Sequence, residues 1–126
     1  QNQIIEIEDL AQGTVADNFI SPREVIAGVI KHNATALILV HNHPSGNPEP
    51  SKADKDLTRD LLYAASIMRI KVLDHIIIGD NTYSSLAREG LISEYEMDFL
   101  NLKVKGTAEA KRNRYQARLF RGLMDT

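Results

Sequence analysis

The chain has 126 residues, of which 43% are hydrophobic and 25% are charged, a composition typical of a single folded globular domain. Its formal net charge of −2 and its isoelectric point near 6.1 exclude the basic footprint that a nucleic-acid-binding domain carries over its whole surface. The absence of cysteine excludes disulfides and thiolate zinc sites and fits a cytoplasmic protein, and no apolar stretch is long enough to cross a membrane.

The opening segment predicts β-structure. The chain begins at Gln1 without an initiator methionine, which indicates a fragment of a longer protein. Residues 3–8 are partly alternating and rich in β-branched side chains, which predicts a strand. Residues 15–19 follow a Gly-Thr loop signal and are compatible with a second short strand.

A helix is predicted to begin after Ser21. Ser21 is a suitable N-cap, Pro22 suits the first helical position, and Glu24 completes a capping box. The helix is expected to end at residues 32–33. Its buried face is expected to carry four apolar side chains, those of Val25, Ile26, Val29 and Ile30.

The middle of the chain alternates strands with helices. Residues 36–40 form a continuous apolar run, which predicts a strand buried on both faces. Residues 71–78 predict a further strand, residues 82–84 its hairpin partner, and residues 85–89 a short helix stopped by a glycine. Between the first two of these strands, a helix over residues 52–68 is expected to bury Leu57, Leu61, Leu62, Ala65 and Met68.

The pattern changes beyond Ile92. The apolar side chains of Tyr95, Phe99, Leu100 and Leu102 could dock a helix, which Gly106-Thr107 is expected to break. Taken together, strands that alternate with helices predict an α/β fold in which helices pack on a mixed sheet.

Two histidines and an aspartate are the candidate metal ligands. His41 and His43, at positions i and i+2, project from the same face of an extended strand, and Asp54 lies in the first turn of the next helix. The Pro/Gly-rich loop between them can fold back and bring the carboxylate to the imidazoles. Two imidazoles and a carboxylate are the protein ligands of one class of catalytic zinc site.

Each of these residues could also have a purely structural role. The histidines could be loop residues that are hydrogen-bonded to the backbone. Asp54 could cap its helix together with Ser51, and this role is compatible with metal binding because a first-turn carboxylate can point away from its own backbone. His75 follows Asp74 at the opening of an apolar strand, where a structural role is expected, with a hydrogen bond to Asp74 or a place behind the ligands as alternatives.

The arrangement of these residues resembles a known motif. His41-x-His43, followed after seven residues by Ser51-x-x-Asp54, is similar to the JAMM metalloprotease motif of JAB/MPN domains. The fuller string His41-Asn-His-Pro-Ser-Gly resembles the RadC branch of that family, as do the segments Ser-Pro-Arg-Glu-Val at 21–25 and Leu-Asp-His-Ile-Ile-Ile-Gly at 73–79. The likeness covers residues 3–92 and leaves 93–126 as a C-terminal helical extension or tail.

The resemblance implies a fold, a cofactor and a reaction. The fold would be a three-layer JAB/MPN (cytidine-deaminase-like) domain, with Zn²⁺ held by His41, His43 and Asp54 and a water in the open position. The reaction would be hydrolysis of a peptide or isopeptide bond in a peptide or protein substrate, with Ser51 as a catalytic donor to the oxyanion.

The family's general base, a glutamate, is expected upstream of this chain. The early acids in the chain suit structural or solvent-exposed positions: Glu24 takes part in a helix cap, and Glu6 and Glu8 alternate outward on a strand. We therefore expect the fragment to bind metal while lacking the base. The full set of upstream acids is Glu6, Glu8, Asp9, Asp17 and Glu24.

Two other functions compete with hydrolysis. RadC-like proteins have a historical association with DNA repair, so the domain could be a non-catalytic metal-binding module that acts in repair or recombination through DNA or protein partners. Lys111, Arg112 and Arg114 would contact the DNA, although a solvated helix face or tail is the preferred explanation for them. Zinc-dependent nucleoside deamination is disfavoured, because that chemistry normally brings a Cys-x-x-Cys element.

Overall fold

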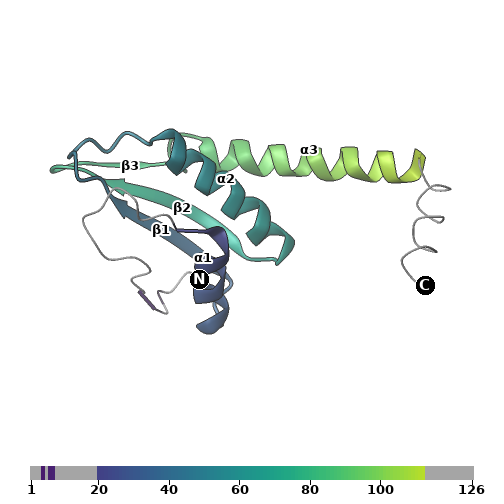
Figure 1. Cartoon of the computed structure of the whole chain (residues 1–126), viewed down its shortest axis with the longest axis horizontal. Coiled ribbons are helices and arrows are strands. Elements are labelled where there is room, and N and C mark those ends of the chain that lie inside the picture. The colour runs from purple at the N-terminus through teal and green to yellow at the C-terminus, as the bar shows by residue number, and fades with distance from the viewer. Residues whose placement is uncertain (1–3, 5, 8–19, 113–126) are drawn as a thin grey trace. The chain divides into compact units, whose positions relative to one another are not determined.

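The structure of the protein, a computed structural model, describes residues 4, 6–7 and 20–112, with side chains up to residue 107 (Figure 1). Of the first predicted strand, only residues 4, 6 and 7 are described, and none of them lies in a strand. The second predicted strand, residues 15–19, lies outside the described residues.

The chain forms two compact units, residues 1–95 and 96–126. In its described part, the first unit contains two complete helices, three strands and the beginning of a third helix, whose remainder belongs to the second unit. The elements, in order, are α1 (Pro22–Lys31), β1 (Ala36–Asn42), α2 (Lys52–Ile67), β2 (Lys71–Ile78), β3 (Tyr83–Ser85) and α3 (Leu91–Arg112).

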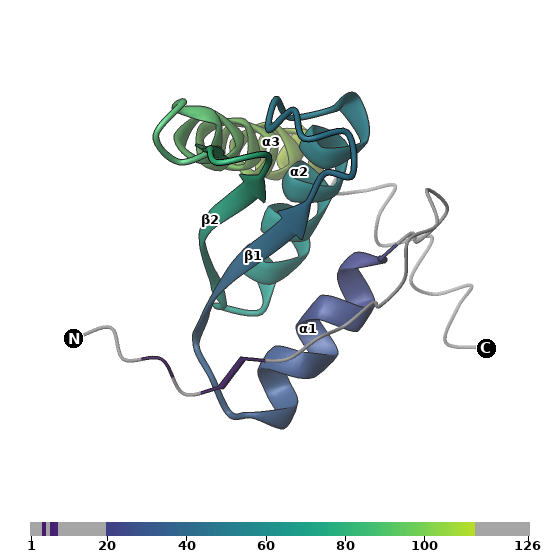
Figure 2. The ribbon, with the colours of Figure 1, turned by 90° about the vertical axis from the view of Figure 1, so that its left-hand side faces the viewer.

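The three strands form one mixed sheet in the order β1-β2-β3. β1 and β2 are parallel and are connected through α2, whereas β2 and β3 form an antiparallel hairpin. Figure 2 shows β1 and β2 side by side, with α2 behind them. The predicted α/β fold with a mixed sheet is therefore confirmed.

The core of the first unit lies between α2 and one face of the sheet. α2 packs on β2, and α1 packs on α2. The buried apolar side chains come from α1, α2, β2, the turn after β3 and the first turn of α3. They include Val25, Val29, Leu61, Leu62, Ala65, Val72, Ile77, Leu86 and Ile92.

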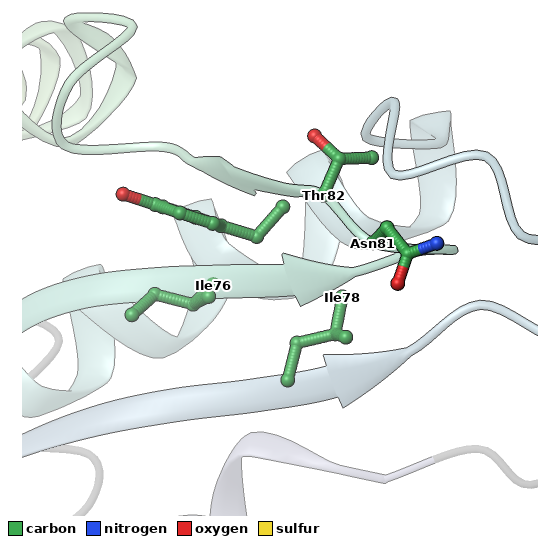
Figure 3. Close-up of a pocket in the computed structure, with 5 residues that line it drawn as sticks. Ile76, Ile78, Asn81 and Thr82 are labelled. Atoms are coloured by element: carbon green, nitrogen blue, oxygen red, sulfur yellow. The ribbon is translucent and has the colours of Figure 1, made fainter.

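The prediction that β1 is buried on both faces is wrong. Ile38 is 52% exposed and Val40 is 57% exposed. Val40 pairs with Ile76, so these side chains share a face with Ile78, and α2 covers the opposite face. Near the hairpin this face forms an apolar groove lined by Ile76, Ile78, Asn81, Thr82 and Tyr83 (Figure 3).

The buried faces of the helices also differ from the prediction. On α1, Val25, Ile26 and Val29 are buried, but Ile30 is exposed. On α2, Leu61, Leu62 and Ala65 are buried as predicted, Leu57 is half-buried, and Met68 is exposed at the C-cap. The buried stripe of α2 instead continues through two polar residues, Thr58 and Asp54.

Two predictions about helices are wrong: the short helix over residues 85–89 and the break at Gly106-Thr107. Residues 86–90 form hydrogen-bonded turns rather than a helix; Gly90, at φ +83°, ends them, and the backbone N–H of Leu91 donates to the carbonyl of Leu86. α3 continues through Gly106 to Arg112, since one glycine weakens a helix by only about 1 kcal/mol. Of the side chains expected to dock it, Tyr95 is buried, whereas Leu100 and Leu102 are exposed.

Candidate metal site

The site begins at the carboxyl end of β1. His41 lies in the strand and His43 directly follows it, with ring centroids 5.0 Å apart and planes at 86°. The backbone N–H of His43 donates to the carbonyl of Ile78 at the end of β2, 3.0 Å away. The pairing of β1 with β2 therefore fixes the backbone positions from which both imidazoles project.

The loop after His43 packs against the turn that joins β2 to β3. The backbone N–H of Asp80 donates to the carbonyl of Gly46 at 2.8 Å. Gly79 permits this close approach, because a Cβ at that position would lie 2.3 Å from the Gly46 carbonyl oxygen. The β2–β3 turn thus supports the loop that carries the chain from β1 to α2.

α2 begins with a complete capping box. The Oγ of Ser51 accepts the N–H of Asp54 at 3.0 Å, and Oδ2 of Asp54 accepts the N–H of Ser51 at 2.9 Å. The carboxylate therefore does not have to turn away from its own backbone to reach the histidines. It caps the helix and faces the two imidazoles at the same time.

The three predicted ligands converge in the structure. His41 Nδ1 lies 3.0 Å from Asp54 Oδ1, and His43 Nε2 lies 2.8 Å from Asp54 Oδ2. One nitrogen or oxygen from each residue falls within 4.8 Å of the others. The side chains of His41, His43 and Asp54 are 49%, 14% and 6% exposed, so the cluster opens to solvent on the His41 side.

The surroundings of His43 test whether a cation fits. Its Nδ1 lies 2.8 Å from the carbonyl oxygen of Asn47, while its Nε2 faces the Asp54 carboxylate. An acceptor therefore faces each ring nitrogen, but a neutral imidazole carries only one proton. With that proton on Nδ1, the other contact requires either a second proton or a cation between Nε2 and the carboxylate. A backbone carbonyl behind a ligating histidine is the usual support in metal sites.

Asp54 is poised to supply negative charge. Burial opposes the ionisation of its carboxyl, but hydrogen bonds from Ser51, the contact with His43 and the nearby His41 outweigh burial and hold its pKa below the usual value. The residues fit a divalent cation that accepts nitrogen and oxygen ligands, as zinc does. That His41, His43 and Asp54 bind zinc stays a prediction.

Ser51 is exposed at the rim of the cluster. Its oxygen accepts the N–H of Asp54, and its side chain also hydrogen-bonds to the Asp54 carboxylate, so a donated bond to a substrate would replace this bond. The predicted catalytic role of Ser51 is compatible with this geometry and stays a prediction.

The structure adds Thr58, which the sequence did not single out, and it places His75 behind the ligands, one of the alternatives left open for that residue. Thr58 and His75 are each 1% exposed, and Thr58 Oγ1 lies 2.6 Å from His75 Nδ1 and 2.7 Å from the carbonyl oxygen of Asp54. The His75 ring stacks near that of His41, with centroids 6.4 Å apart. The spacing of four residues between Asp54 and Thr58, one helical turn, is the signal that could have revealed Thr58.

The environment of His75 is more apolar than its position beside Asp74 suggested. Asp74 accepts the backbone N–H of His75 at 2.7 Å rather than a proton from its ring. Burial lowers the pKa of His75 to about 4, against the opposing effect of Asp54, so the ring is neutral at neutral pH. Its Nε2 has no hydrogen-bond partner among the described residues.

Other predicted functional residues lie away from this cluster or outside the described part. Glu24 is exposed in the first turn of α1, and Glu6 is exposed as well. The remaining early acids, Glu8, Asp9 and Asp17, lie outside the described residues. Lys111 and Arg112 are the last two residues of α3, and their side chains are not among those described. Arg114 lies outside the described residues, so the contact of these three residues with DNA stays a prediction. Among the described residues, no helix is both long and apolar enough to cross a bilayer.

Comparison with known proteins identifies the family of the chain. The model of the RadC-like JAB domain family matches residues 1–91. A UPF0758 protein of Desulforudis audaxviator is 50% identical over 91 residues, which are 72% of this chain and 40% of that protein. A UPF0758 protein of Symbiobacterium thermophilum is 42% identical over 93 residues, covering 74% of this chain and 40% of the relative.

A UPF0758 protein of Paracidovorax citrulli is 46% identical over 92 residues, or 73% of this chain and 39% of the relative. The chain thus spans about two fifths of the length of these curated relatives. The family model covers most of the chain, including β1, the loop and the capped helix that carry the cluster. The chain therefore belongs to the RadC-like JAB domain family.

Proposed function

We propose that the protein is a zinc-dependent hydrolase of peptide or isopeptide bonds. The observation that carries the proposal is the convergence of two imidazoles and an ionised carboxylate at the end of a strand, with an acceptor facing each ring nitrogen of His43. Membership in the RadC-like JAB family supports the same chemistry.

The side chains of His41, His43 and Asp54 would hold the zinc ion. When bound, zinc would supply an acidified water as nucleophile and would polarise the substrate carbonyl. Asp54 contributes charge from a helix end that its own capping box makes rigid, and the Asn47 carbonyl orients His43. Ser51 would donate its hydroxyl proton to the oxyanion that develops on the substrate, in place of its bond to the Asp54 carboxylate.

The general base is proposed to come from the longer protein. The described acids Glu6 and Glu24 are exposed, and Glu24 lies in the first turn of α1. Asp54 already belongs to the ligand cluster. Because the chain spans about two fifths of its relatives, a glutamate outside it can complete the site.

Metal binding is the first test. We expect the wild-type chain to bind about one zinc ion when it is titrated against a chromophoric chelator, and His41→Ala, His43→Ala and Asp54→Asn to lose most of that affinity. Asp54→Asn is the sharpest of these, because asparagine keeps an acceptor for the cap but removes the charge. His32→Ala, at the C-cap of α1, is the matched control and should bind like the wild type. Equal zinc affinity in all variants would refute the ligand assignment.

Turnover is the second test, in the full-length protein. Cleavage of peptide and isopeptide-linked substrates should stop with a chelator, return with zinc and be abolished by Asp54→Asn. A full-length protein that binds zinc but cleaves none of these substrates would contradict the hydrolase proposal. Titration with duplex DNA at several salt concentrations would then test the binding-module alternative.

A further inference from the structure

A chain of hydrogen bonds connects β2 to the helix turn that carries Asp54. His75 Nδ1 lies 2.6 Å from Thr58 Oγ1, which lies 2.7 Å from the backbone carbonyl oxygen of Asp54. Thr58 and His75 are both 1% exposed. This chain of hydrogen bonds is therefore short and buried, and it ends on the residue that supplies the proposed carboxylate ligand.

The direction of these bonds follows from proton counting. The carbonyl oxygen of Asp54 can only accept, so the single hydroxyl proton of Thr58 is used there. Thr58 Oγ1 must then accept from His75, which places the imidazole proton on Nδ1. The chain runs from the His75 Nδ1–H through the Thr58 hydroxyl to the carbonyl oxygen of Asp54, and only this direction satisfies both bonds.

The His75 end of this chain is held firmly. The backbone N–H of His75 donates to Asp74 Oδ1 at 2.7 Å, and the same carboxylate accepts the hydroxyl of Ser85 at 2.5 Å and the N–H of Ala87 at 2.9 Å. β2 also pairs His75 with Leu39, two residues before His41. The backbone of His75 is thus anchored by strand pairing and by Asp74, which β3 and the turn after it hold in place.

His75 also contacts the other half of the cluster. Its ring lies 6.4 Å from that of His41, centroid to centroid, at an interplanar angle of 29°. One buried side chain therefore touches a proposed ligand on β1 and, through Thr58, fixes the helix turn of a proposed ligand on α2. An apolar pair would fill this space without the cost of burying a hydroxyl and an imidazole, whose Nε2 has no partner among the described residues.

We propose that Thr58 and His75 are positioning residues that set the separation of Asp54 from the two histidines and thereby the affinity of the site for metal. The proposal rests on the proposed zinc site. It extends that site by adding a second support besides the capping box, one that links the histidines on β1 to Asp54 on α2.

The test compares zinc affinities of the 126-residue chain by chelator competition. Thr58→Val keeps the size of the side chain and removes the hydroxyl, so we expect zinc binding to weaken roughly 10- to 100-fold. Thr58→Ser keeps the hydroxyl and should remain within about threefold of wild type. His75→Leu should weaken binding like Thr58→Val, and His75→Asn, whose amide can donate near the position of Nδ1, should recover part of the loss.

Two further measurements separate positioning from general stability. Val29→Ala removes a buried side chain of α1 that is remote from the cluster in sequence, and it should lower the melting temperature while leaving zinc affinity unchanged. The visible absorption spectrum of the Co²⁺-saturated protein should shift in Thr58→Val but not in Thr58→Ser or Val29→Ala. Should His75→Leu fail to fold, the two Thr58 variants still decide the question.

Equal zinc affinities and equal cobalt spectra for Thr58→Val and Thr58→Ser would overturn the positioning role while leaving the zinc site in place. Absence of zinc binding by the unsubstituted chain would instead overturn the proposed metal site and, with it, this inference. The two failures are therefore distinguishable in one set of titrations.

Discussion

The charge of His75 links the buried network to pH. Burial lowers the pKa of His75 to about 4, whereas the ordinary value, which applies to the unfolded chain, is 6.5. Between these values the unfolded chain binds a proton at this residue and the folded chain does not. Unfolding then takes up a proton, so the free energy of unfolding contributed by His75 falls as the pH drops from 6.5 toward 4.

We predict that the metal-free chain loses stability in this pH range because of His75. The difference between the two pKa values corresponds to roughly 3 kcal/mol. Urea unfolding at about pH 7, 6, 5 and 4.5 should show the decline, and His75→Asn should flatten it. The pKa of Asp54 is lowered from its ordinary value, so its contribution to the free energy of unfolding is lost only in more acidic solution, below the range of this test. The same slope in both proteins would contradict the prediction.

The clustering of His41, His43 and Asp54 could be predicted from the sequence, but the pairing of Thr58 with His75 behind them could not. His41, His43 and Asp54 were identifiable because strand periodicity, a capping signal and the spacing of a known motif are all local. The pairing of Thr58 with His75 joins residues 17 apart, and it depends on how α2 lies on β2. Only packing reveals such a contact.

At the scale of one element, the N-terminus of α2 combines two roles that substitutions can separate. Ser51 caps the helix through its oxygen and is proposed to act on substrate through its proton. Ser51→Ala should lower the free energy of unfolding by about 1 kcal/mol, whereas Ser51→Gly should cost only a few tenths.

If Ser51 is the donor to the oxyanion, both substitutions should lower the turnover of the full-length protein by roughly 10²- to 10³-fold. Stability is measured by urea denaturation and turnover by initial rates on one substrate. Turnover that declines only in step with stability, and is spared in Ser51→Gly, would show that the serine acts as a cap alone.

Two glycines, one just before α3 and one inside it, should respond in opposite ways to the same substitution. Gly90 has φ +83°, so Gly90→Ala forces a strained backbone and should destabilise the protein by about 1–2 kcal/mol. Gly106 lies inside the helix, and a Cβ there would meet no atom within 4 Å, so Gly106→Ala should strengthen the helix by up to about 1 kcal/mol.

Far-UV circular dichroism during thermal unfolding measures both effects. A loss of helicity in Gly106→Ala would contradict the continuous helix of the structure and would restore the break that the sequence predicted. The error in that prediction has a general cause. A glycine lowers helix propensity slightly wherever it lies, but it favours a helix end mainly where it adopts positive φ, and Gly106, unlike Gly90, does not.

The exposure of one face of β1 could not be predicted from the sequence of the strand. A continuous apolar run predicts a strand covered on both faces, yet Ile38 and Val40 are exposed. Strand pairing places these residues on the face of the sheet opposite α2. The apolar sequence of the strand does not specify which elements cover each face of the sheet. The β2 prediction succeeded because its apolar run, strand length and following turn signal agree.

At the scale of the first unit, the proposed metal site depends on a contact between two loops far apart in the chain. The loop after His43 meets the turn after β2, where the Asp80 N–H donates to the Gly46 carbonyl oxygen. The intervening α2 and β2 bring these segments together. The carbonyl of Asn47, which orients His43, lies in the part of the loop that this contact holds.

We therefore predict that Gly79→Ala disrupts the site from outside it. The new Cβ would lie 2.3 Å from the Gly46 carbonyl oxygen and 2.8 Å from Cδ of Pro48, which is closer than packed atoms allow, so the loop must shift. A displaced Asn47 carbonyl no longer orients His43, and zinc affinity should fall about tenfold or more. Thr82→Ala, an exposed change in the same turn, is the matched control and should leave zinc affinity unchanged. Wild-type affinity in Gly79→Ala would mean that the ligands are held by β1 and the α2 cap alone, and that the β2–β3 turn has no part in the site.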